Sequence, residues 1–272
     1  EKVKDPLLTT LAHENLGLVL SDQQRYPDAL LQFQEQQRIA ESNSNKLTAG
    51  YAIMNQGNML WRLGRYEDAG KYFAWALNIA NSDTPRNEDL LAWLNLFKAE
   101  RALSQHDFGE AIARSKEAQI VGAKLKPVVV RATYLLGLAK SLNDDRSGRK
   151  LCEKAVELAR GMRDPRPLPE ALLALSEAAL KSGDLQTAVA SAAEAQQKFQ
   201  QAGQRESEWR ALVTQARASR QGNQENIPAL ISRASSILTG LQQEWGNHYD
   251  SYSARIDVQR DLKELGRLRG RD

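Results

Sequence analysis

Residues 55–77 of the chain read NQGNMLWRLGRYEDAGKYFAWAL. A small residue, Gly57, stands where the two helices of a hairpin would cross, and a Gly-Arg-Tyr turn comes shortly after it. Beyond the turn, Ala69, Phe73 and Ala76 follow one another at spacings of four and three residues. This spacing places the three side chains on one face of a helix. The stretch therefore predicts a helical hairpin with a shared apolar stripe.

The same skeleton recurs along the chain at a nearly fixed period. When the crossing position is set at Gly17, Gly57, Ala99 and Gly137, the intervals are 40, 42 and 38 residues. One such hairpin cannot bury its apolar stripe alone, so neighbours are expected to stack and share a continuous core. The predicted hairpins cover residues 9–42, 48–81, 88–122, 128–161, 168–202 and 205–242, and one further helix covers 245–268.

Turn and cap residues fit the predicted hairpins. Gly64 and Gly183 are expected in the turns between paired helices, and Asp184 is expected to cap the helix that follows it. Pro27 and Pro228 are expected in the first turn of a helix, where the missing N–H breaks no hydrogen bond.

The composition suits a soluble helical array and excludes several other classes. Apolar residues make up 42% of the chain and charged residues 26%, and 37 basic residues against 34 acidic ones give a net charge of +3. This balance argues against nucleic acid or a lipid surface as the main partner. No apolar run is long enough to span a bilayer.

The single cysteine, Cys152, excludes an internal disulfide and favours a reducing, cytoplasmic location. The chain begins at Glu1 without methionine, so a processed chain or a piece of a larger protein is expected.

The skeleton resembles the tetratricopeptide repeat family over roughly residues 9–240, and the second hairpin matches the family pattern almost in full. The usual unit of the family has about 34 residues. The longer period here is similar to the long-helix variety of kinesin light chains, LGN-type adaptors and large bacterial signalling proteins. The resemblance implies an all-α, right-handed superhelical solenoid of about six hairpins with a C-terminal capping helix, forming one repeat domain over 1–272. The fourth hairpin departs from the pattern, because Gly148 stands where the family has Ala.

In this family the first helix of each hairpin lines a concave groove, and the resemblance implies that an extended peptide binds there. The groove positions fall on Asn15, Tyr51, Asn55, Asn58, Arg62, Trp93, Glu100, Arg131 and Tyr134. Asn15 and Asn55 lie 40 residues apart at equivalent places, which resembles the asparagine ladder of the long-repeat members. An amide both donates and accepts, so it pairs with a peptide backbone of any sequence. The alternative is that these amides cap local backbone groups or face water. Phe97 occupies the matching place in the third hairpin, so the ladder would be short.

The aromatic candidates have two interpretations. Tyr51, Trp93 and Tyr134 are candidate anchors for a ligand, since aromatic residues are enriched in binding hot spots. They would otherwise pack between hairpins. Trp61 and Trp75 are expected to be packing residues.

Two arginines of the groove, Arg62 and Arg131, are candidates for holding an acidic side chain or a C-terminal carboxylate. The clamp of the chaperone-binding family members is not reproduced. Glu14 stands where its first Lys is expected, and Leu18 stands where its first Asn is expected. Binding of a chaperone tail is therefore disfavoured.

The sequence contains no recognisable catalytic set, so no enzymatic activity, cofactor or metal is expected. The three histidines, at 13, 106 and 248, lie far apart and lack metal-ligand spacing. Cys152 falls at an apolar helix position, which favours a buried structural thiol over a nucleophile.

The predicted function is a scaffold module that binds a protein or peptide, as part of a larger bacterial signalling or regulatory protein. One alternative is a peptide-sensing regulatory domain that controls an attached effector. Another is an RNA-binding helical repeat, for which a stronger basic stripe would be expected. Other domains of the same chain are further candidate partners. The helix over 245–268 is expected either to cap the array or to dock against an adjoining domain.

Overall fold

The computed structural model describes residues 5–82, 85–222 and 226–270. In these ranges the chain forms fourteen α-helices and no strand. The helices are α1 Pro6–Asp22, α2 Tyr26–Ser42, α3 Lys46–Arg62, α4 Tyr66–Ser82, α5 Glu88–Ser104, α6 Phe108–Val121, α7 Lys126–Leu142, α8 Ser147–Arg160, α9 Pro167–Lys181, α10 Leu185–Gln201, α11 Arg205–Gln221, α12 Ile227–Trp245, α13 His248–Ser253 and α14 Ile256–Leu268. None of the helices in the described ranges has the length and apolar character needed to cross a membrane.

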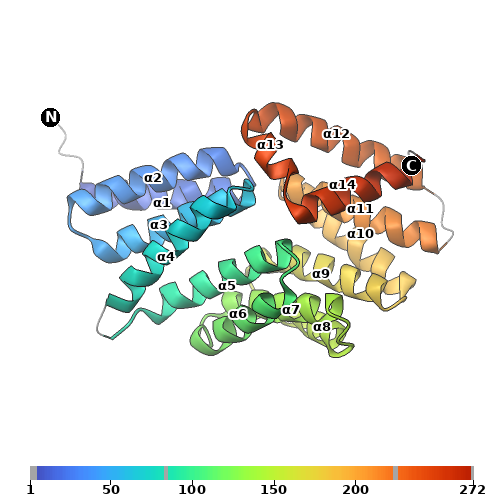
Figure 1. Cartoon of the computed structure of the whole chain (residues 1–272), viewed down its shortest axis with the longest axis horizontal. Helices are drawn as coiled ribbons and strands as arrows, with labels where there is room; N and C mark the ends of the chain where they lie inside the picture. The colour runs from blue at the N-terminus through green and yellow to red at the C-terminus, as the bar shows by residue number, and fades with distance from the viewer. Residues whose placement is uncertain (1–4, 83–84, 223–225, 271–272) are drawn as a thin grey trace. The chain divides into compact units, whose positions relative to one another are not determined.

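The first twelve helices alternate as the first and second members of helical hairpins (Figure 1). The first helices begin at residues 6, 46, 88, 126, 167 and 205, so the period near 40 is a property of the structure. The helix bounds lie within a few residues of the predicted hairpin ranges. The predicted all-α solenoid of helical hairpins is confirmed.

The contacts between residues divide the chain into two compact units. Unit 1 comprises Glu1–Leu94 together with Trp245–Ala254, and unit 2 comprises Asn95–Glu244 together with Arg255–Asp272. The boundaries fall inside α5, at the end of α12 and between α13 and α14. One repeat domain over 1–272 remains a prediction.

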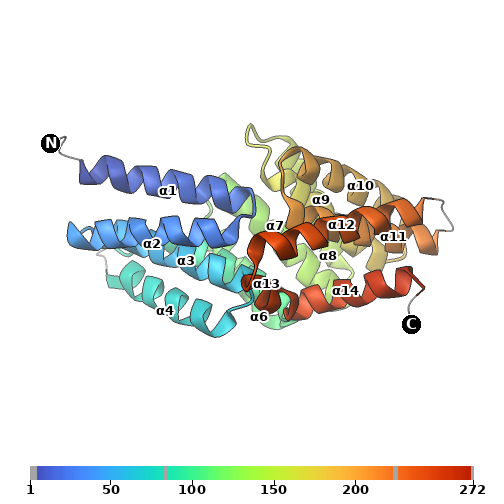
Figure 2. The same cartoon turned by 90° about the horizontal axis from the view of Figure 1, so that it is seen from above.

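In unit 1, α1 to α4 lie side by side as two stacked hairpins (Figure 2). Glycines at the crossings make room for aromatic rings of the paired helix. A Cβ atom at position 17 would come within 2.6 Å of the Phe33 ring, and one at position 57 would come within 2.8 Å of the Phe73 ring. Phe33 and Phe73 are each 1% exposed. The predicted use of Gly17 and Gly57 as crossing residues is confirmed.

In unit 2, the crossing of α7 and α8 brings backbone against backbone. A Cβ atom at Gly137 would lie 2.8 Å from the Cys152 backbone nitrogen and 2.8 Å from the Gly148 carbonyl oxygen. A Cβ atom at Gly148 would overlap the Gly137 carbonyl oxygen. The departure of Gly148 from the family pattern thus has a physical reason: two facing glycines allow a closer approach than glycine against alanine.

The turns within the hairpins share one backbone conformation. In the turns of the first five hairpins, the residues at positive φ are Gln24 at 61°, Gly64 at 81°, His106 at 61°, Asp144 at 61° and Gly183 at 80°. Three of the five carry a side chain, although L residues adopt this region at a cost. The repeat geometry therefore imposes the left-handed turn, and the sequence uses glycine in only two of these places.

The predicted caps are confirmed. The Asp184 side chain accepts a hydrogen bond of 3.0 Å from the backbone N–H of Thr187. Pro27 lies in the first turn of α2, and Pro228 lies in the first turn of α12.

The prediction of one helix over 245–268 is wrong. Trp245 ends α12, and the segment beyond it is broken into α13 and α14. Gly246 adopts a φ of +50°, which starts the first break. Arg255 has an extended ψ of 139°, and this breaks the helix a second time before Ile256. The first piece belongs to unit 1 and the second to unit 2.

Candidate functional site

The two ladder asparagines lie on the first helices of unit 1. Asn15 on α1 is exposed, whereas Asn55 on α3 is 7% exposed. Within the described residues, neither amide makes a side-chain hydrogen bond, so both retain their capacity to donate and accept.

The other two polar candidates of α3 are engaged within unit 1. The Asn58 side-chain oxygen accepts a hydrogen bond of 2.9 Å from the Trp61 indole N–H and one of 3.3 Å from Arg62 Nε. The Arg62 guanidinium lies over two rings, 4.8 Å from the Trp61 centroid and 5.6 Å from the Tyr26 centroid. These contacts hold the end of α3 in place, which gives both residues a structural role.

Tyr51 lies beside acidic groups of the same unit. Its hydroxyl is 3.4 Å from the Asn87 side-chain oxygen. Burial raises the pKa of Tyr51 to about 12, with further contributions from Asp89 and Glu14. Trp93 on α5 is partly buried, so it offers only part of its ring as an anchor.

Sequence reasoning used Glu14 only as a departure from the chaperone clamp, and the structure gives it more weight. Glu14 is partly buried, and burial raises the pKa of its carboxyl. It makes no ion pair with any described residue. Two large apolar side chains of the same helix, Leu11 and Leu18, are 44% and 41% exposed. The α1 part of unit 1 therefore presents a carboxylate, an amide and apolar surface together.

In unit 2, the predicted groove residues form an internal network. Arg131 on α7 lies 2.5 Å from a Glu100 oxygen and 3.6 Å from a Glu170 oxygen. The Tyr134 hydroxyl donates to Glu170. Burial favours the neutral form of Arg131, but Glu100 and Glu170 outweigh this and hold its pKa well above the usual range. The chain's own carboxylates thus occupy the Arg131 guanidinium, and its binding of a ligand carboxylate stays a prediction.

A helix of the chain itself covers part of the first-helix surface in unit 2. Arg210 on α11 contacts Asp257 and Asp261 near the start of α14, with N–O distances of 2.9 Å to each. Arg260 on α14 lies 3.6 Å from a Glu177 oxygen on α9. The sequence analysis did not identify this contact, and the only signal available for it was the helical spacing of Asp257 and Asp261.

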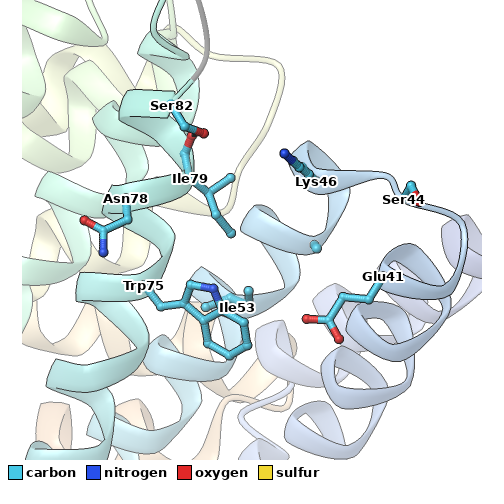
Figure 3. A pocket seen from close by; sticks show the side chains of 9 residues that line it. Glu41, Ser44, Lys46, Ile53, Trp75, Asn78, Ile79 and Ser82 are labelled. Carbon is cyan, nitrogen blue, oxygen red and sulfur yellow. Dashed lines mark hydrogen bonds between the residues drawn. The ribbon is translucent and has the colours of Figure 1, made fainter.

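A hollow of about 530 Å³ lies between α2, α3 and α4 in unit 1 (Figure 3). Ile53, Ile79 and Trp75 supply apolar surface, and Glu41 and Lys46 stand at its edge. Trp75 is 45% exposed, so its prediction as a packing residue is wrong. The same prediction for Trp61, which is 4% exposed, is confirmed.

Neither a metal cluster nor a reactive thiol is found in the part of the chain that the structure describes. No group of three or more metal-binding side chains occurs there. Cys152 is buried as predicted, and burial raises the pKa of its thiol to about 12.

Comparison with known proteins rests on solved structures. No family model matches the chain, and no curated protein matches it. A Rap protein complexed with competence and sporulation factor aligns over 99% of this chain and 78% of its own, with a TM-score of 0.63 and 12% identity. The chain has a tetratricopeptide-type repeat fold.

Two further structures align with this repeat solenoid. One is a signal transduction ATPase with numerous domains and a tetratricopeptide repeat sensor, from Pyrococcus horikoshii. It has a TM-score of 0.51 and 16% identity over 96% of this chain, which spans 41% of that protein. The other, PilF of Pseudomonas aeruginosa, has a TM-score of 0.49 and 17% identity over 96% of this chain and 100% of its own. At these identities the similarity concerns the fold.

Proposed function

We propose that this chain is a scaffold module that binds an extended protein segment on the first-helix face of unit 1. The observation that carries the proposal is the pair of amides at Asn15 and Asn55, which occupy equivalent places of successive hairpins and make no side-chain hydrogen bond with a described residue. Side chains that serve only the fold normally find hydrogen-bond partners when they are buried. Asn58, on the same helix, has done so. The Asn55 side chain makes no hydrogen bond with any described residue, although Asn55 is 7% exposed.

The neighbouring groups define the kind of segment that fits. An asparagine amide pairs with the N–H and C=O of an extended backbone, so the ladder fixes the direction of the chain and leaves its sequence open. Glu14 supplies a carboxylate for a basic side chain of the segment. Leu11 and Leu18 supply apolar contact on either side of it. The preferred ligand is therefore an extended segment with a basic residue between apolar ones.

The setting we propose is a larger bacterial signalling or regulatory protein, with the long-period repeat variety as its closest family type. The solved structures with this fold include a Rap protein complexed with competence and sporulation factor and an ATPase with a repeat sensor. This part of the proposal rests on analogy of fold.

The test begins with capture of partners from source-cell lysate on the immobilised chain, followed by mass spectrometry. The segment shared by the captured partners is then synthesised and titrated by calorimetry. We expect Asn15→Ala and Asn55→Ala each to weaken binding roughly fivefold, because each removes hydrogen bonds worth about 1 kcal/mol. Glu14→Gln is expected to weaken only those segments that carry the basic residue.

Asn143→Ala serves as the matched control, since Asn143 is exposed at the end of α7 in unit 2. Circular dichroism verifies that each variant is folded. Equal affinity of the wild type and the Asn15→Ala/Asn55→Ala variant for the segment would contradict the proposal.

A second candidate function, a sensing domain that controls an attached effector, is favoured by the contact of α14 with α9 and α11 in unit 2. Ion pairs hold this helix, and a basic group of the ligand that competes with Arg210 for Asp257 and Asp261 would release it. Hydrogen exchange of residues 256–268 with and without the captured segment tests this candidate. Faster exchange on binding supports sensing, and unchanged exchange contradicts it.

A further inference from the structure

The hollow between α2, α3 and α4 is distinct from the first-helix face described above. Its floor is formed by Ala49 and Ile53 of α3, which are 3% and 0% exposed as residues. Ile79 of α4 stands beside this floor (Figure 3). Apolar lining with a few polar groups at the edge is typical of binding pockets, and a volume of about 530 Å³ lies in their usual range.

The side wall of the hollow is an exposed tryptophan. Trp75 is 45% exposed, and its ring lies near that of Tyr72 on the same helix, with centroids 6.3 Å apart. The other tryptophans of the two units, apart from the partly buried Trp93, are almost fully buried. Tryptophan at the edge of a concave apolar surface is the residue type that contributes most to protein interfaces. Trp75 is therefore a candidate contact residue for a partner.

The edge of the hollow carries one charge of each sign. Glu41 accepts a hydrogen bond of 2.7 Å from the neutral Gln37 side chain, which leaves its negative charge in place. The Lys46 ammonium makes neither a hydrogen bond nor an ion pair with any described residue. It stands at the start of α3, whose first turn contains no acidic residue, so the positive end of the helix dipole adds to its field. Lys46 therefore offers a cation at the N-terminal end of α3 to an acidic group of a partner.

We propose that this hollow is a second binding surface of unit 1, and that its occupant is a partner protein segment with a large apolar side chain next to an acidic residue. The apolar side chain would lie on Ile53 and Ile79 against the Trp75 ring. The acidic residue would pair with Lys46. This surface selects the opposite charge from the face of α1, where Glu14 favours a basic residue.

Three short fluorescein-labelled peptides of matched length test the proposal by fluorescence anisotropy. The first has a Leu-Phe centre flanked by Asp residues, the second has the same centre flanked by Lys, and the third has an Ala-Ala centre flanked by Asp. We expect the wild type to prefer the first peptide to both others. Trp75→Ala should weaken its binding about tenfold, as expected for an interface hot spot. Lys46→Glu should reverse the preference between the first and second peptides.

The controls separate this surface from the rest of the chain. Leu31→Ala removes a side chain of α2 that is 57% exposed, and Lys124→Glu makes the same charge change at an exposed site of unit 2. Both are expected to bind like the wild type. Asn15→Ala/Asn55→Ala should also leave this binding unchanged, so failure of one proposal is distinguishable from failure of the other.

Absence of binding by the first peptide up to about 1 mM, the weak end of the affinity scale, overturns the proposal. Equal binding of all three peptides overturns it as well. The proposal is also overturned if Trp75→Ala binds the first peptide with wild-type affinity while its circular dichroism spectrum matches that of the wild type.

Discussion

Arg255 and Asp257 lie two residues apart in the interior of unit 2 and form a bidentate pair. Arg255 Nε is 3.1 Å from one Asp257 oxygen, and Arg255 Nη2 is 2.7 Å from the other. The residues are 2% and 5% exposed, so water screens neither charge. The pair forms at the start of α14, and it links this helix to α11 through Arg210, which also contacts Asp257.

Breaking this pair should destabilise unit 2 strongly. Arg255→Leu leaves the Asp257 carboxylate buried with one of its cationic partners removed. Loss of one partner of a buried pair typically costs about 3–5 kcal/mol, which is the upper limit here because Arg210 remains. Urea unfolding followed by circular dichroism measures the change. Arg267→Leu is the control, because its pair with Glu264 is half exposed and worth at most about 1 kcal/mol. Equal midpoints for the two variants would contradict the structural role of Arg255.

Unit 2 should lose stability in acid. Burial favours the protonated form of Asp257, but Arg255 and Arg210 outweigh it and lower its pKa. Burial acts in the same direction on Glu177, and Arg260 and Arg217 likewise lower its pKa. A carboxyl with a lowered pKa in the fold stabilises it above the unfolded value, and this contribution is lost as the pH falls. We expect the free energy of unfolding to decline as the pH is lowered from about 5. Asp257→Asn should show a shallower decline. If the free energy of unfolding of Asp257→Asn fell with pH as steeply as that of the wild type, Asp257 would not contribute to the acid sensitivity.

Gly64 and Gly183 offer a matched comparison, because both have φ near +80°. A Cβ atom at position 183 would meet no atom within 4 Å. Gly183→Ala should therefore lower the free energy of unfolding only by the backbone strain, about 1 kcal/mol. A Cβ atom at position 64 would overlap the Ser251 carbonyl oxygen of α13. Gly64→Ala should therefore cost about 1–3 kcal/mol more and increase hydrogen exchange in residues 248–253. Equal costs would show that α13 does not rest on the Gly64 turn.

The thiol of Cys152 should be inert in the folded chain. Its pKa of about 12 keeps it protonated, whereas in the unfolded chain it ionises near 9. The folded state is then favoured below the unfolded value, and this contribution is lost as the pH rises toward 12. We expect slow reaction with iodoacetamide at pH 8, at a rate set by unfolding. Cys152→Ala/Glu117→Cys, with the thiol at an exposed position of α6, should react quickly. Fast labelling of the folded wild type would disprove burial of the thiol.

Much of the fold could be predicted because its determinants are local. The period near 40, the small residues at Gly17, Gly57 and Gly137 and the cap at Asp184 are all visible as spacing in the chain. The candidate site was predicted less completely. The spacing predicted Asn15 and Asn55 as ligand-binding residues, and it predicted Arg131 equally. The carboxylate partners of Arg131 lie 31 and 39 residues away in the sequence. A partner at such a separation leaves no periodic trace.

The sequence by itself determined the helical hairpins, because apolar periodicity and small crossing residues act within one repeat. Only the tertiary structure decided which polar groups remain available. It paired Arg210 with Asp261, 51 residues away, and left the ammonium of Lys46 without such a pair among the described residues. It also broke the last predicted helix at Arg255 and exposed Trp75 beside a hollow. These outcomes depend on contacts between distant segments, where burial and ion pairing outweigh the local preference of each residue.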